Sequence, residues 1–179
     1  MKSIFFPALL MLFSLCAESE VTSSELFKRI NERLGYMEDV ALFKARNHLP
    51  IEDIEREKIV IEKAKASAHE QGLDPEHIED FFKAQISVAK AIQFRYRADL
   101  LSQPSVREPK DLQKQIRPHL LKLGDQIIQQ LVMYIKDYNS FKSMQFADFD
   151  AAINVKYVTI SDKQVLFRAL QKIKFLPAN

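Results

Sequence analysis

Two basic residues, Arg33 and Lys44, have a spacing that would let them bind one small anion together. They stand eleven residues apart, and on a continuous helix this separation places them within about 20° of the same face and roughly 16 Å apart along the axis. Their long side chains could therefore reach inward from both sides toward a shared ligand. The alternative is that both are solvated or pair with surface carboxylates, and spacing alone favours this alternative.

A second group of polar residues lies at the start of another predicted helix. Asp53, Arg56 and Glu57 follow an i, i+3, i+4 pattern, which places both carboxylates beside the guanidinium on one face. The same pattern is typical of a surface salt-bridge set in which Asp53 caps the helix. Gln93 follows Ala89 by four residues near an apolar helical face, where it is either a site residue or a solvated boundary residue. None of these groups identifies a function alone.

Composition and the remaining motifs argue against several functional classes. The formal net charge is only +2, so there is no electrostatic basis for binding nucleic acid. The three glycines leave little scope for phosphate-binding loops. There is no Gly-x-Ser-x-Gly motif and no cysteine-based nucleophile, and the four histidines lack the spacing of metal ligands. We therefore predict a protein that uses neither a metal nor a cofactor, and we interpret the histidines as solvated or capping residues. They are His48, His69, His77 and His119.

The N-terminus has the pattern of a secretory signal peptide. Lys2 precedes an almost uninterrupted apolar run over residues 4–15, which is too short to span a bilayer, and small or polar residues follow it. We expect residues 1–19 to be the signal, with cleavage near Ala17 or Ser19. A lipoprotein acylated on Cys16 is the alternative, but a bulky leucine precedes this cysteine. The sequence thus predicts a periplasmic or secreted protein that does not associate with the membrane once the signal is removed.

The rest of the chain, residues 20–179, predicts a single all-α domain of about six helices. Apolar residues recur at three- and four-residue spacing, and prolines, glycines and small polar residues separate the segments. Asp74-Pro75 is a capping residue followed by proline at the first helical position, whereas Pro118 either kinks a helix or marks its first turn. The strand-like run 155–160 has no partner strand, so we interpret it as a connection. The predicted helices are 24–47, 50–71, 75–102, 110–140, 146–155 and 161–172.

Taken in order, these segments resemble the secreted, gamma-subclass chorismate mutases, whose fold is an all-α bundle of the type II class. The matching stretches are Arg33-Leu34 with Met37, Val40-Ala41-Leu42-Phe43-Lys44-Ala45, Leu49-Pro50-Ile51-Glu52-Asp53, Arg56-Glu57, Gly72-Leu73-Asp74-Pro75, Phe81-Phe82-x-x-Gln85-Ile86, Ala89-Lys90-x-Ile92-Gln93, Asp111-Leu112 and Ile116-Arg117-Pro118. The resemblance covers about residues 25–125 well and the C-terminal third only loosely. It implies a [3,3] rearrangement of chorismate to prephenate without a cofactor or a covalent intermediate.

The resemblance also implies how the basic residues act. Arg33, Arg56 and Arg117 would hold the two carboxylates of chorismate, a task that suits planar guanidinium groups. Lys44 would donate to the ether oxygen and a neighbouring carboxylate, and Gln93 would donate a second hydrogen bond to that oxygen. Arg117 is the least secure of these, because a loop of variable length places it.

Three further positions follow from the resemblance. Asp53, through its backbone, and Glu57 would order the hydroxyl of the cyclohexadienyl ring. Ala89 departs from the family pattern, because relatives carry serine or threonine there near a substrate carboxylate, so one polar contact is absent or supplied by water.

Two aspects of assembly and two rival functions remain open at this point. Small intracellular relatives complete each site with an arginine from a partner chain, whereas Arg117 lies in the same chain here, so we expect each subunit to hold a complete site. The resemblance implies a homodimer through the first helices. The rival functions are an exported helical binding or chaperone-like protein and a degenerate mutase that serves as a secreted interaction factor.

Overall fold

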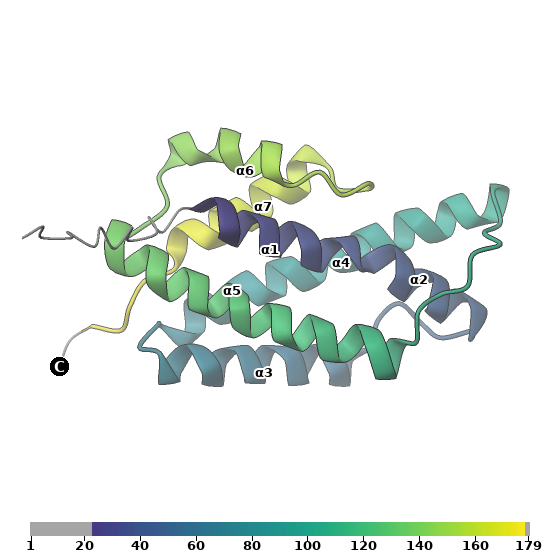
Figure 1. Ribbon diagram of the computed structural model, residues 1–179, viewed down its shortest axis with the longest axis horizontal. Coiled ribbons are helices and arrows are strands. Elements are labelled where there is room, and N and C mark those ends of the chain that lie inside the picture. Colours follow the sequence, from purple (N-terminus) through teal and green to yellow (C-terminus); the bar gives the residue numbers. More distant parts are fainter. Residues whose placement is uncertain (1–22, 178–179) are drawn as a thin grey trace, which may run out of the picture.

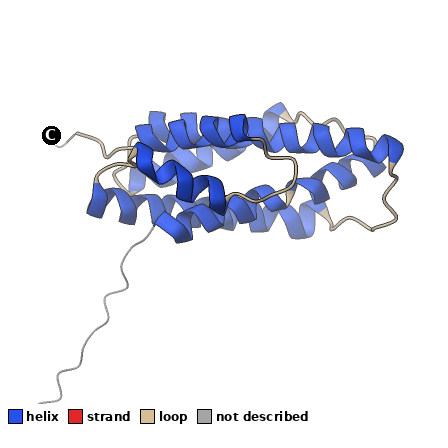
Figure 2. Cartoon of the chain, turned by 90° about the horizontal axis from the view of Figure 1, so that it is seen from above, coloured by secondary structure: helices blue, strands red, loops and turns tan. Residues whose placement is uncertain are grey.

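The computed structural model describes residues 23–177, and the predicted signal segment 1–19 lies outside this part of the chain. Within it, long helices lie side by side along the long axis of the molecule (Figures 1 and 2). The described part of the chain contains no β-strand, so the predicted all-α fold is confirmed. The α-helices are α1 (Ser23–Gly35), α2 (Met37–Arg46), α3 (Ile54–Glu70), α4 (Pro75–Ser102), α5 (Arg117–Tyr138), α6 (Phe146–Ala152) and α7 (Ile160–Lys172).

The first predicted helix, 24–47, is two helices, so the described chain has seven α-helices where about six were expected. The interruption falls at Gly35-Tyr36, and Tyr36 keeps near-helical dihedral angles while its carbonyl accepts from the amide of Val40 at 3.0 Å. Glycine is a poor helix former, so interrupting the helix at this point costs little free energy. The prediction was wrong here because the apolar periodicity continues across the break.

Aspartate side chains cap the starts of α3 and α4. The Asp53 carboxylate accepts from the amide of Arg56 at 3.2 Å, and the Asp74 carboxylate accepts from the amide of Glu76 at 3.1 Å. Pro75 occupies the first turn of α4, where its absent N–H breaks no helical bond. The α3 start is later than predicted, because residues 50–53 form the connection that leads into Asp53.

Pro118 marks the first turn of α5 and does not kink a longer helix. A single π-helical turn, η1 (Leu112–Ile116), precedes it, capped by the Asp111 side chain. The predicted helix 110–140 is therefore this turn followed by α5. This arrangement positions Arg117 at the junction of the two elements.

The C-terminal third covers one side of the bundle, with α6 packed on α1 and α7 packed on α4 (Figure 1). A short 3-10 helix, η2 (Ser143–Gln145), precedes α6. Residues 155–159 form a connection, as predicted, and the guanidinium of Arg95 fixes it by donating to the Tyr157 carbonyl at 2.5 Å. A single β-bridge between Leu73 and Phe175 ties the chain end to the α3–α4 turn.

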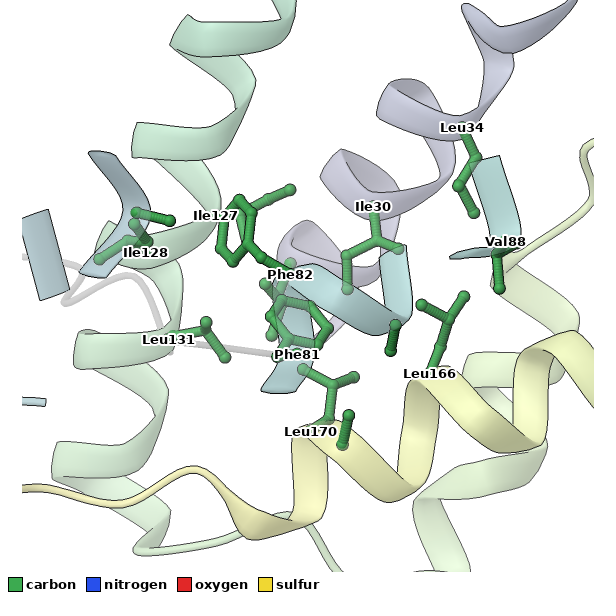
Figure 3. Packing of buried hydrophobic residues seen from close by; sticks show 14 of the residues in the cluster. Ile30, Leu34, Phe81, Phe82, Val88, Ile127, Ile128, Leu131, Leu166 and Leu170 are labelled. Atoms are coloured by element: carbon green, nitrogen blue, oxygen red, sulfur yellow. The ribbon is translucent and has the colours of Figure 1, made fainter. Parts of the chain in front are cut away.

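The hydrophobic core lies where α1, α4, α5 and α7 meet. Phe81 and Phe82 of α4 are almost fully buried there, among apolar side chains from the other three helices (Figure 3). Their rings stand edge to face, with centroids 5.7 Å apart, a favourable geometry for an aromatic pair. This packing fixes α4 against α1 and α5, the helices that carry much of the site. None of the described helices has the length and apolar character needed to cross a membrane.

Candidate active site

A cavity of about 130 Å³ lies between α1, α2, α3, α4 and α5. All eight residues singled out in the sequence line it, although they come from five helices and their caps. The interpretation of Arg33 and Lys44 as separate surface cations is therefore wrong. The eight are Arg33, Lys44, Asp53, Arg56, Glu57, Ala89, Gln93 and Arg117.

Three buried or half-buried cations that line this cavity have no acidic partner within the described residues. Across residues 23–177, none of Arg33, Lys44 and Arg56 forms an ion pair with a carboxylate. Buried or half-buried cations are normally paired, because removing a charge from water is costly. A cavity lined by unpaired cations is suited to an anionic ligand.

Lys44 is the most buried of these cations, with 7 % of its surface exposed. Its Nζ donates to the carbonyl of Ile51 at 2.6 Å, which anchors the side chain across the α2–α3 connection. An ammonium group has three N–H donors, so two remain for a ligand. Desolvation lowers the pKa of Lys44 below the usual lysine value, and the charges of Arg117 and Arg97 lower it further, against the opposing effect of Asp53 and Glu57.

Arg33 is held on α1 by a hydrogen bond from its Nη1 to the carbonyl of Leu120 on α5, at 2.9 Å. Its guanidinium carbon lies 5.8 Å from the centre of the Phe82 ring, in a cation–π arrangement. Although Arg33 keeps some solvent exposure, desolvation of its guanidinium lowers its pKa to about 10, and the positive charge of Arg56 adds to this effect.

Asp53 connects the start of α3 to the start of α5. Its carboxylate caps α3 through one oxygen and accepts from Arg117 Nη2 through the other, at 2.8 Å. Arg117 also donates to Gln113 at 3.1 Å, so both ends of its guanidinium are fixed. The Asp53 amide donates to the Glu57 carboxylate at 3.4 Å. Burial lowers the pKa of Arg56, and the nearby charge of Arg117 contributes, whereas Asp53 opposes the shift.

Gln93 reaches the cavity from α4 with only 5 % of its surface exposed. Its Nε2 donates to the carbonyl of Ala89 at 3.1 Å and lies 3.8 Å from the sulfur of Met37. A carboxamide nitrogen has two N–H groups, and both have acceptors here, but the thioether sulfur of Met37 is a weak acceptor that a ligand oxygen can replace. The Oε1 atom is buried and has no hydrogen-bond partner within the described residues. Ala89 itself offers no hydroxyl group to the cavity.

Four polar residues of the cavity were not predicted as site residues, namely Lys63, Gln85, Lys90 and Asp125. Gln85 lines the cavity from α4, one turn before Ala89, and Lys90 lines it while pairing with Glu57 at 3.1 Å and Glu52 at 3.3 Å. Gln85 could have been found from its spacing, because Gln85, Ala89 and Gln93 repeat every four residues on one helical face.

The sequence profile that describes the chorismate mutase type II family matches residues 16–94 of this chain. A protein of Yersinia pestis named secreted chorismate mutase is 42 % identical over 146 residues, which cover 81 % of this chain and 78 % of that protein. The chain belongs to the chorismate mutase type II family. The monofunctional chorismate mutase of Enterobacter agglomerans is 32 % identical over 174 residues, which are 96 % of each chain.

Solved structures of chorismate mutases have the same fold. The crystal structure of the secreted chorismate mutase from Yersinia pestis superposes with a TM-score of 0.79 at 40 % identity, over 85 % of this chain and 98 % of that one. The chorismate mutase structure from Burkholderia thailandensis gives a TM-score of 0.68 at 24 % identity, covers 82 % of this chain and 95 % of that one, and so shows the fold alone. The predicted family, fold class and chorismate mutase activity are confirmed. The roles of the individual site residues stay predictions.

Proposed function

We propose that this chain converts chorismate to prephenate in the cavity between α1 and α5, by a [3,3] rearrangement that needs no cofactor and no covalent intermediate. Chorismate carries two carboxylates and one ether bridge. The observation that carries the proposal is the set of three cations, Arg33, Lys44 and Arg56, that line one cavity without any carboxylate partner among the described residues. The two carboxylates of a small dianion would compensate two of these three positive charges.

The arginines are assigned to substrate binding. A guanidinium group pairs with a carboxylate through two parallel hydrogen bonds, which fixes orientation as well as charge. Arg33 and Arg56 face the cavity from α1 and α3, and Arg117 faces it from the start of α5. Holding both carboxylates at once selects the compact, chair-like conformer, and such preorganisation removes much of the barrier of an intramolecular reaction.

Lys44 and Gln93 are assigned to the breaking C–O bond. Negative charge grows on the ether oxygen as this bond breaks, and fixed donors stabilise that charge in the transition state. A millionfold acceleration requires about 8 kcal/mol, and a single well-placed donor of this kind is worth roughly 3–4 kcal/mol. Two such donors together with orientation by the arginines are sufficient. The Asp53 amide and the Glu57 carboxylate are assigned to the ring hydroxyl.

The names of two relatives bear on where the protein acts. Two relatives are named secreted chorismate mutases, and this supports a periplasmic or secreted protein in which residues 1–19 are the signal and residues 20–179 are the catalytic domain. The eight site residues of one chain line one cavity, which supports an active site complete within each subunit. The homodimer remains part of the proposal on the basis of family resemblance.

The test is a kinetic assay on residues 20–179, which follows the loss of chorismate by its ultraviolet absorbance. We expect turnover by the unsubstituted protein and a loss of at least about a hundredfold in Lys44→Ala, the effect of removing one transition-state donor. Lys58→Ala is the matched control, because Lys58 is exposed on α3 outside the cavity, and it should retain full activity. Absence of chorismate turnover by the unsubstituted protein would contradict the proposal.

A further inference from the structure

Gln85 is the most deeply buried polar residue in the described part of the chain, with 1 % of its surface exposed. It lines the cavity from the middle of α4. Neither its Nε2 nor its Oε1 has a hydrogen-bond partner within residues 23–177. An amide buried without partners destabilises the folded state, since both polar atoms lose their bonds to water. Its position in the cavity suggests that a ligand compensates for this cost.

The surroundings of Gln85 indicate which part of a ligand it would meet. Helical side chains lean toward the N-terminus of their helix, so Gln85 extends over the preceding turn, which carries Phe82. The Arg33 guanidinium lies over the Phe82 ring. Arg33 has one hydrogen bond to the Leu120 carbonyl and no carboxylate partner among the described residues. Gln85 stands one helical turn after Phe82, and Arg33 lies over the Phe82 ring, so an uncompensated cation and an unpaired amide both line the cavity beside this residue.

We infer that Gln85 is a substrate-positioning residue that donates a hydrogen bond from Nε2 to the carboxylate held by Arg33. The inference rests on the proposed function, and it adds a contact that neither the spacing of the charged residues nor the family resemblance assigns. Ala89, one turn further along α4, has no hydroxyl with which to make such a contact. A carboxylate oxygen accepts several hydrogen bonds, so one guanidinium leaves room for this second donor.

The contact should affect binding and leave the chemical step unchanged. The charge of a carboxylate hardly changes during the rearrangement, because the bond that breaks is at the ether oxygen. A donor to that carboxylate therefore stabilises the bound substrate and the transition state equally, and its loss raises KM without lowering kcat. Gln93 and Lys44 are different in this respect, since their losses should lower kcat.

The experiment compares Gln85→Met with the unsubstituted protein in the chorismate assay and in thermal unfolding without ligand. Methionine keeps the length of the side chain and removes both polar atoms. We expect KM to rise about tenfold, in line with a hydrogen bond to a charged group, while kcat changes less than threefold. The midpoint of thermal unfolding should rise, because the unpaired amide is gone. If Gln85 had only a structural role, Gln85→Met would instead lower the midpoint of thermal unfolding.

Two further variants keep the inference testable. Gln129→Met is the matched control, since Gln129 is exposed on α5 and does not line the cavity, and it should leave KM unchanged. Gln85→Glu should raise KM more than Gln85→Met at neutral pH and recover partly on acidification, because only a protonated carboxyl donates. This variant tests the inference even if Gln85→Met does not fold.

Unchanged KM in both Gln85 variants of an active enzyme, or a fall in kcat alone, would overturn the inference and leave the proposed function standing. An inactive unsubstituted protein would overturn both.

Discussion

Burial changes the chemistry of single residues in this cavity, and Lys44 is the clearest case. Its ammonium group is desolvated, anchored to the Ile51 carbonyl and free of any carboxylate ion pair within the described residues. Spacing alone favoured a solvated lysine, because a sequence records that Lys44 lies on a helix but not that the α2–α3 connection folds over its end. The spacing of Gln85, Ala89 and Gln93 places them on one helical face, but it does not show how deeply the two glutamines are buried. A glutamine on a helix looks identical in the sequence whether its face meets water or a cavity.

The lowered pKa of Lys44 leads to a prediction about the dependence of kcat/KM on pH. The ammonium form is the donor, and desolvation first of all, then the charges of Arg117 and Arg97, favour its deprotonation. Activity should therefore begin to fall at a pH below the ordinary lysine pKa of 10.5. We expect no rise in rate as the pH falls, because the Gln93 carboxamide does not titrate in this range and donates its N–H at any pH.

The measurement is kcat/KM between about pH 4 and pH 10, a range that runs from the ordinary pKa of carboxyl side chains to just below that of lysine. Circular dichroism at each pH serves as the control for unfolding. A rate that climbs steeply on acidification through about pH 5, where a carboxyl group titrates, would contradict the assignment of Gln93 as the second donor.

At the scale of elements, the start of α4 was the most predictable feature. Asp74-Pro75 fixes the start of α4 because the carboxylate satisfies a free amide and proline needs no helical partner. The break between α1 and α2 was not predictable, since Tyr36 continues the helical bonding pattern and the apolar face runs through it. The position of Arg117 was uncertain from the sequence because it depends on η1, whose π-helical turn has no sequence signature comparable to a cap.

Asp53 links two elements, and substitutions can separate its two roles. Asp53→Ala removes both the α3 cap and the partner of Arg117. It should lower the free energy of unfolding by about 1 kcal/mol, or about 2–4 °C in the unfolding midpoint, and raise KM because Arg117 loses its orientation. Asp53→Asn keeps an oxygen for the cap and loses the charge, so it should preserve stability and still raise KM.

The matched control for this pair is Asp74→Ala, which removes the cap of α4 at a residue that does not line the cavity. It should reduce stability by a similar amount while KM stays constant. Thermal unfolding and steady-state kinetics on the three variants provide the comparison. If Asp53→Asn showed an unchanged KM, the ion pair with Arg117 would have no part in substrate binding.

At the scale of the whole molecule, the fold brings together residues that are distant in the sequence. Arg33 and Arg117 come from helices whose packing depends on the aromatic core around Phe81 and Phe82 (Figure 3). The all-α class was predictable from periodicity and the scarcity of glycine. The arrangement of α6 and α7 was not, because their docking depends on contacts such as the Arg95 hydrogen bond to Tyr157, which no local pattern encodes.

In the proposed mechanism, separate helices present two donors to one breaking bond, with Lys44 on α2 and Gln93 on α4. The most direct test is kcat for Gln93→Leu at saturating chorismate, because Gln93 is assigned to the ether oxygen alone. We predict a fall of about a hundredfold, as for the loss of one transition-state donor, with KM changed only a few-fold. An unchanged kcat in a folded Gln93→Leu variant would contradict the account.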